Sequence, residues 1–215
     1  MCYLFPRILF VFLCLQVCVL TNLAQAALIY NESVNGELSG TIGIPTVIGT
    51  LDLGINNVIG STTSSPLDRD FWIITIPTGQ RLSTVTLRSY TTTDAAGGGF
   101  MAVYTGTLTT IPTNDVAGQS QLLGGTLVGF AAGRSQGDNV LDDLGLSTAV
   151  PNAQKFSGPL PAGTYTFWTQ EATGNQTYNY EFNVTAVPEP STIALVGLLL
   201  GGLFVRRRRA RVNHR

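Results

Sequence analysis

Residue types that many enzymes use for catalysis are nearly absent from this chain of 215 residues. Its three cysteines (Cys2, Cys14 and Cys18) all lie near the start, and its one histidine is His214, next to the last residue. Residues 27–187 therefore contain no thiol nucleophile, no Ser-His-Asp triad and no disulfide framework. A zinc site built from the usual cysteine and histidine ligands is nearly excluded there as well.

Positive charge is also scarce in this central part, which is called the body below. Lys155 is the one lysine of the chain, so a Ser-Lys dyad would depend on a single residue. The body contains twelve Asp and Glu residues against five Arg and Lys residues, a formal charge of −7. An acidic body without a basic patch argues against a nucleic-acid partner. No Walker loop is present, since Gly97, Gly98 and Gly99 precede an expected strand rather than a helix.

Helical periodicity is absent from every ten-residue window of the body, and only Asp138 to Leu146 could form a short helical turn. The clearest strand is Thr177 to Thr185, where aromatic and apolar residues alternate with polar ones. Further strands are expected at Val47–Leu53, Phe71–Ile76, Ser83–Tyr90, Phe100–Tyr104, Gly125–Phe130 and Thr164–Glu171. Many short strands in about 160 residues predict an all-β fold, an antiparallel two-sheet sandwich or jelly roll.

The first 26 residues have the pattern of a secretory signal peptide. Arg7 is the only charged residue among the first 31, and an apolar stretch runs from Ile8 to Leu20. Ala24-Gln25-Ala26 is a small-x-small cleavage site, so Ala27 is the predicted mature N-terminus. No twin arginine precedes the apolar stretch, which predicts export through the general machinery and cleavage by signal peptidase.

The last 29 residues, 187–215, combine three elements in a fixed order. Pro188, Glu189 and Pro190 come first, an apolar run from Thr192 to Val205 follows, and a basic cluster ends the segment. The run of 14 residues is short of the ~20 that span a bilayer comfortably, and the arginines would stay in the cytoplasm. The basic cluster begins with Arg206, Arg207, Arg208 and Arg209.

This order of elements resembles the bacterial PEP-CTERM sorting signal. The resemblance implies processing near the Pro-Glu-Pro motif by an exosortase, a membrane-embedded cysteine transpeptidase. It also implies an exported protein that is held transiently in the inner membrane and then delivered to the cell surface or its polysaccharide. A plain C-terminal membrane anchor is the alternative reading of the same residues.

The β-sandwich domain is expected at residues 27–186, and its part from about residue 48 to about residue 185 carries a second and softer resemblance. An acidic segment (Asp68 to Asp70) enters an aromatic strand, a Gly-containing turn follows at Pro77 to Leu82, and Pro161 to Trp168 starts a later strand. These features resemble the bacterial pre-peptidase C-terminal domain, a β-sandwich. The resemblance implies a non-catalytic accessory or adhesive module, although the segment from Thr105 to Phe156 is longer than that pattern needs.

Carboxylates offer two kinds of site. Asp138, Asn139, Asp142 and Asp143 supply four side chains within six residues, which predicts a calcium site, with an Asx-capped turn as the alternative. Asp68 and Asp70 form a second and weaker calcium candidate. A pair of acids flanking a bond would also suit glycoside hydrolysis, but solvated loop acids are the simpler interpretation.

Aromatic residues raise the possibility of carbohydrate binding. Trp72 and Trp168 could stack on sugar rings if they face outward, although residues in apolar strands more often belong to the core. The sequence as a whole predicts an exported, non-catalytic surface or matrix protein associated with exopolysaccharide. The alternatives are a carbohydrate-binding or calcium-stabilised adhesion module, and a carboxylate-based hydrolase.

Overall fold

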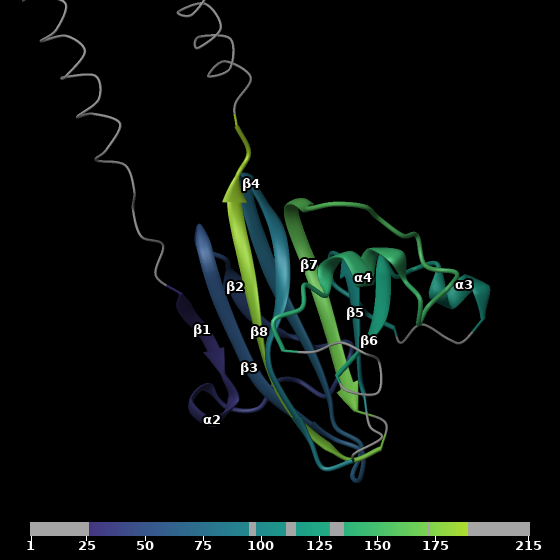
Figure 1. The fold of residues 1–215 in the computed structure, drawn as a ribbon. Helices are drawn as coiled ribbons and strands as arrows, with labels where there is room; N and C mark the ends of the chain where they lie inside the picture. Colours follow the sequence, from purple (N-terminus) through teal and green to yellow (C-terminus); the bar gives the residue numbers. More distant parts are fainter. Residues whose placement is uncertain (1–25, 95–97, 111–114, 130–135, 172, 189–215) are drawn as a thin grey trace, which may run out of the picture.

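The computed structural model describes residues 26–94, 98–110, 115–129, 136–171 and 173–188 (Figure 1). Strands dominate these residues, which confirms the predicted all-β class. The strands are β1 (Ala27–Asn31), β2 (Thr46–Thr50), β3 (Gly54–Thr63), β4 (Arg69–Thr92), β5 (Gly99–Thr105), β6 (Gly124–Val128), β7 (Leu160–Glu171) and β8 (Asn175–Ala186). Three short helices accompany them: α2 (Glu32–Asn35), α3 (Val116–Gln119) and α4 (Leu141–Leu146).

The eight strands form one hydrogen-bonded sheet in the order β1-β3-β8-β4-β7-β5-β6, and β2 pairs with β4 beside this path. Most neighbours are antiparallel, as predicted, but β1 with β3 and β2 with β4 are parallel pairs. The sequence predicts two separate sheets, whereas the structure has one connected sheet with two halves. The halves are connected because one long strand belongs to both of them.

That shared strand is β4, which changes its partner midway. Its first part pairs with β7 from Arg69 to Ile76, and its second part pairs with β8 from Gln80 to Thr92. At Arg81 and Leu82, just after the change, it pairs with both strands. The register shifts between Ile76 and Arg81, where Pro77 lacks an amide hydrogen and Gly79 has a positive φ of 77°. The two predicted strands Phe71–Ile76 and Ser83–Tyr90 are therefore the two parts of β4.

The two halves of the sheet pack face to face through aromatic rings. Trp72 of β4 stacks on Tyr178 of β8 with 6.0 Å between ring centroids. Phe167 of β7 meets Phe182 of β8 edge-on at 5.2 Å. None of these pairs are neighbours in the hydrogen-bonded ladders, so the contacts cross from one half to the other. This sandwich-like core explains how the body reaches stability without disulfides.

The long segment between β5 and β7 covers the outer face of the half of the sheet that contains β5, β7 and the first part of β4. Leu108, Leu122 and Val150 from this segment pack against Phe71 and Trp168 in a separate apolar cluster. Helix α3 belongs to this segment, whereas α4 packs with the main core on the inner face, because Leu141 and Leu144 share a cluster with Trp72 and Phe167. The helical turn predicted within Asp138 to Leu146 is α4, whose Leu141 and Leu144 are buried in the main core.

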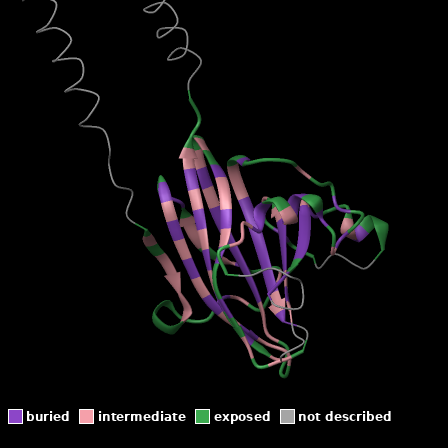
Figure 2. Cartoon of the chain, in the orientation of Figure 1, coloured by how far each residue is buried: buried purple, intermediate pink, exposed green. Residues whose placement is uncertain are grey.

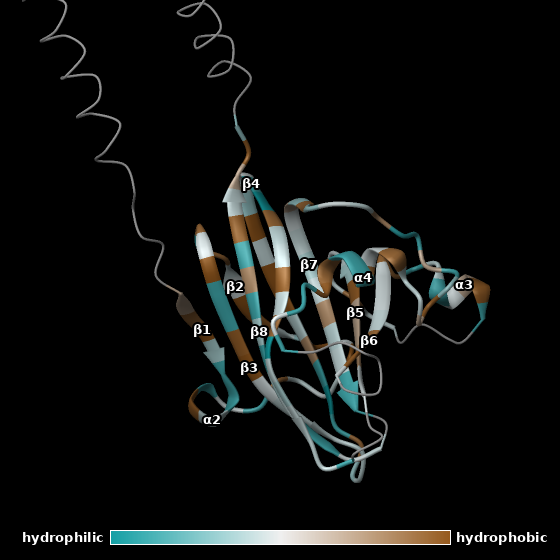
Figure 3. Ribbon diagram, in the orientation of Figure 1, coloured by the Kyte–Doolittle hydropathy of each residue, from teal (hydrophilic) through white to brown (hydrophobic). Residues whose placement is uncertain are grey.

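Strand β3 pairs with β8 along its whole length, yet its sequence did not predict a strand. Its inward positions are buried but include Gly54, Asn56, Gly60 and Thr62, so apolar alternation is missing. By contrast, β8 alternates clearly between hydrophobic and hydrophilic residues (Figure 3), and burial alternates along both strands (Figure 2). The side-chain amide of Asn56 is satisfied by donating to the Asp52, Gly54 and Phe182 carbonyls.

Gly60 is required for a close approach rather than for its φ angle. A Cβ atom there would overlap the Tyr178 side chain, which lies across the strand. Gly60→Ala should therefore lower the free energy of unfolding by about 1–3 kcal/mol through overpacking, measured by urea denaturation. Gly43→Ala is the matched control, because a Cβ there meets nothing within 4 Å. Equal stabilities of the two variants would contradict this account.

Candidate functional site

The residues predicted to bind calcium form a helix entry instead of converging on an ion. Asn139 Oδ1 accepts hydrogen bonds from the backbone amides of Val85 and Leu141, both at 3.1 Å. Its amide donates to Asp142 at 3.3 Å. The carboxylates of Asp138, Asp142 and Asp143 do not form a convergent group within the described residues. These bonds are those of the alternative, an Asx-type turn, which leads into α4. Calcium binding by these residues stays a prediction.

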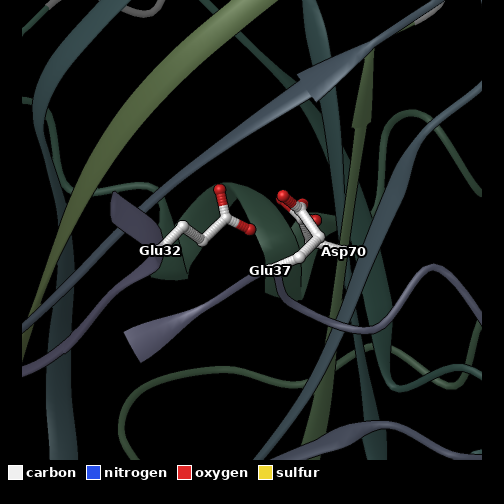
Figure 4. A group of neighbouring side chains, drawn as sticks. All are labelled: Glu32, Glu37 and Asp70. Atoms are coloured by element: carbon white, nitrogen blue, oxygen red, sulfur yellow. The ribbon is translucent and has the colours of Figure 1, made fainter. Parts of the chain in front are cut away.

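A different group of carboxylates does converge. Glu32, Glu37 and Asp70 each place a carboxylate oxygen within 4.8 Å of the others, and Figure 4 shows the three side chains pointing toward one another. We call these three residues the carboxylate cluster. Glu37 is exposed, Glu32 is partly exposed and Asp70 is buried, so the cluster runs from the surface inward.

The short helix α2 holds Glu32 in place, and Glu37 lies in the loop that follows it. Asn31 caps it by accepting from the amide and hydroxyl of Ser33, and Gly36 ends it with a φ of 95°. The Glu32 carboxylate accepts from the amides of Leu38 at 3.1 Å and Ser61 at 2.6 Å. These bonds tie the loop after α2 to β3 and fix the position of Glu32.

Asp70 enters the cluster from β4. Its Oδ2 accepts a hydrogen bond of 2.5 Å from the Tyr178 hydroxyl, while its Oδ1 is buried and has no hydrogen-bond partner among the described residues. Burial raises the pKa of Asp70 to about 9, and the negative charge of Glu32 adds to this effect. The Tyr178 bond acts in the opposite direction but does not offset the burial.

The surrounding groups respond to the same concentration of negative charge. Burial, then the charge of Glu32 and a hydrogen bond with it, raise the pKa of Glu37. Burial and the charge of Glu37 raise the pKa of Asp68. The pKa of Tyr30 rises through burial and through the three cluster carboxylates. Each shift disfavours negative charge, so the cluster requires either protons or a cation.

Three converging carboxylates can hold a hard cation, because such cations prefer oxygen ligands. Glycoside hydrolysis suits this cluster poorly. Its two acids must flank a bond of the substrate, and Asp70 is fully buried. Asp70 is therefore not placed to be one of the two acids that flank a sugar bond.

The sequence indicated only part of this cluster. Asp70 belongs to the weaker calcium candidate, Asp68 and Asp70, but its partners are Glu32 and Glu37 rather than Asp68 alone. Glu32 and Glu37 lie more than thirty residues away along the chain, in a segment without any metal-binding spacing. The acidic residues are spread along the body, so no charge run in the sequence marks this group either.

The two tryptophans predicted as sugar platforms are core residues. Trp72 is fully buried and stacks between Phe167 and Tyr178. Trp168 is only 8% exposed and packs against Phe71 and Phe100. Neither ring offers a face to a polysaccharide, because the two halves of the sheet enclose Trp72 and the segment after β5 covers Trp168.

A hollow of about 320 Å³ lies where β3, β8 and β4 run side by side near one end of the sheet. Its residues carry hydroxyl and amide groups, but apolar atoms make up most of its lining surface. The hydroxyls of Thr91 and Thr177 bond to each other across the strands. We call it the threonine hollow, and its residues are Ser61, Thr62, Thr63, Thr91, Thr92, Thr93, Asn175, Gln176 and Thr177.

The processing segments adjoin the two limits of the sheet. Ala26 is exposed and Ala27 begins β1, whereas Ala24 lies outside the described residues. Pro188 is exposed just after the end of β8, and Glu189, Pro190 and the four arginines from 206 to 209 lie outside the described residues. No helix in the described part of the chain is long and apolar enough to cross a membrane.

Comparison with known proteins identifies the tail. Residues 186–209 match the family model of the PEP-CTERM protein-sorting motif. The chain thus carries the signal of an exported protein that is sorted by exosortase and is transiently anchored in the membrane. No curated protein and no solved structure matches the chain. The resemblance of the body to the pre-peptidase domain therefore stays a prediction.

The buried acid predicts an unusual dependence of stability on pH. An acid whose pKa is higher in the folded protein stabilises the fold below its unfolded pKa of about 4, and this stability is lost as pH rises toward about 9. Both proteins are measured in EDTA. The free energy of unfolding of the wild type, minus that of Asp70→Asn, should fall by up to about 1.4 kcal/mol per pH unit between pH 5 and 8. Urea denaturation of both proteins measures the difference.

Asp52→Asn serves as the control, since Asp52 is exposed and lies outside the carboxylate cluster. It should keep the pH dependence of the wild type. A wild-type protein whose stability relative to Asp70→Asn is independent of pH would show that Asp70 does not hold a proton in the fold.

Proposed function

We propose that this protein is a non-catalytic component of the bacterial cell surface or extracellular matrix, associated with exopolysaccharide. The observation that carries the proposal is the PEP-CTERM motif at residues 186–209, which begins at the last residue of β8. A folded body followed directly by a sorting segment is suited to release of that body outside the membrane.

The junction between the body and the motif supports this order of events. Among the described residues, Val187 is the last that bonds to the sheet, through its amide to the Gly79 carbonyl at 2.8 Å. Pro188 is exposed and keeps the residue before it extended. Because β8 lies between β3 and β4, loss of residues from β8 would disrupt the sheet. Processing after the Pro-Glu-Pro motif leaves all eight strands intact.

The body contributes binding rather than catalysis in this proposal. It lacks histidine and cysteine, and its buried carboxylate cluster suits an ion. The threonine hollow combines a mostly apolar lining surface, which can pack on the C–H faces of sugar rings, with hydroxyl and amide groups, which can exchange hydrogen bonds with sugar hydroxyls. This hollow is the surface that we assign to polysaccharide, in place of the two buried tryptophans.

Processing is tested by the intact mass of the exported protein. We expect the surface form to begin at Ala27 and to lack the residues after the Pro-Glu-Pro motif, including Arg215. Replacing Glu189 and Pro190 with alanine should trap full-length protein in the membrane fraction. The exposed Leu146→Ala is the control and should be processed as the wild type is. A surface protein that retains Arg215 would identify the tail as a permanent anchor.

Polysaccharide binding is tested with the double variant Thr91→Val/Thr177→Val. Removing both hydroxyls leaves neither partner of their mutual bond unsatisfied, so the fold should persist. Co-sedimentation with polysaccharide purified from the producing bacterium should fall about five- to tenfold, the equivalent of one or two lost hydrogen bonds.

The matched control is Thr75→Val/Thr164→Val, which removes a similar threonine pair between β4 and β7, away from the hollow. It should bind polysaccharide as the wild type does. Equal loss in both double variants, or no binding by the wild type, would rule out the threonine hollow as the contact surface.

A further inference from the structure

We propose that Glu32, Glu37 and Asp70 form a calcium site that fastens the N-terminal segment of the body to the sheet. The site is distinct from the residues of α4 that the sequence indicated, and it is independent of the polysaccharide contact. Its ligands come from α2, from the loop after it and from β4 (Figure 4).

The first support is the buried carboxylate at its base. Asp70 is 0% exposed, and its Oδ1 accepts no hydrogen bond from the described residues. A buried carboxylate oxygen without a partner is costly, because it has lost water and gained nothing in exchange. The side chain points into the cluster, so a cation at the centre would satisfy the oxygen that the protein leaves unpaired.

The second support is charge. Within the described residues, no arginine or lysine forms an ion pair with any member of the cluster, and the ion pair that is present joins Arg88 to Glu181 elsewhere. Like charges this close repel one another strongly in a partly buried setting. A divalent cation would offset this repulsion for all three carboxylates at once.

The ligand set favours calcium over magnesium. Ca²⁺ lies about 2.3–2.6 Å from its ligands and accepts several carboxylates in flexible geometry. The three oxygens lie within 4.8 Å of one another, so one Ca²⁺ could contact all of them. Mg²⁺ requires a strict octahedron, keeps several waters and is usually held by only one or two carboxylates. The exposed side, next to Glu37, leaves room for water ligands.

The position of the site gives it a structural consequence. Strand β1 and helix α2 lie at the edge of the sheet, where β1 has only β3 as a neighbour. Glu32 and Glu37 follow directly after β1, whereas Asp70 is in the shared strand β4. A bound ion would therefore cross-link the first residues of the exported chain to the core. Calcium-binding modules outside cells commonly have a Kd of about 10⁻⁴ to 10⁻³ M.

The test uses the purified exported protein, first treated with EDTA and then given CaCl2 or MgCl2 at millimolar concentration. We expect equilibrium dialysis to find one Ca²⁺ per chain, and the melting temperature to rise with CaCl2 because the ion binds the folded state. Glu37→Gln, at the exposed side of the site, should keep the fold and weaken calcium binding about tenfold or more. Asp70→Asn should abolish the calcium-dependent rise.

Asp142→Asn is the matched control, because it removes a carboxylate from the other acidic group and should leave calcium binding unchanged. The proposal is overturned if calcium neither binds nor raises the melting temperature. It is also overturned if Asp142→Asn, rather than Glu37→Gln, loses the effect, or if MgCl2 produces the same rise as CaCl2.

Discussion

A hydrogen bond between the buried side chains of Tyr178 and Asp70 links the core of this protein to its candidate ion site. The tyrosine belongs to β8 and the aspartate to β4, so the bond joins the two halves of the sheet. On the core side, Tyr178 stacks on Trp72, and Gly60 leaves space for it. On the other side, Asp70 meets Glu32 and Glu37. Packing and electrostatics therefore depend on the same pair of residues.

The processing segments and the strands of the body occupy different parts of the chain. The predicted removal of a signal peptide before Ala27 and the predicted processing after the Pro-Glu-Pro motif both lie outside the strands, so maturation at these positions would break no hydrogen bond of the sheet. The body has no cysteine, and its stability comes from an aromatic core enclosed by a folded sheet. The segment between β5 and β7 adds a second apolar cluster on the outside.

Strands were predictable where inward positions are aromatic or aliphatic, and they were missed where the core selects for small or polar groups. β8 is recognisable because Tyr178, Tyr180, Phe182 and Val184 alternate with polar residues, which is the pattern of a half-buried strand. β3 is equally buried, but its inward glycines and Asn56 are accommodated by the opposite strand, and this is a tertiary condition. The sequence likewise predicts two strands where the structure has the single strand β4, because the bend of β4 at Pro77 and Gly79 has the residue types of a loop.

The sequence by itself determined the all-β class, the export signal and the sorting motif, because signals of this kind are read from a chain segment and do not require a folded partner. Only the tertiary structure decided which acids meet and which aromatic rings are buried. Asp138, Asp142 and Asp143 are close along the chain but diverge around a helix entry, whereas Glu32 and Glu37 are brought to Asp70 by the sheet. Proximity in the sequence is not proximity in space when strand pairing joins residues that are far apart along the chain.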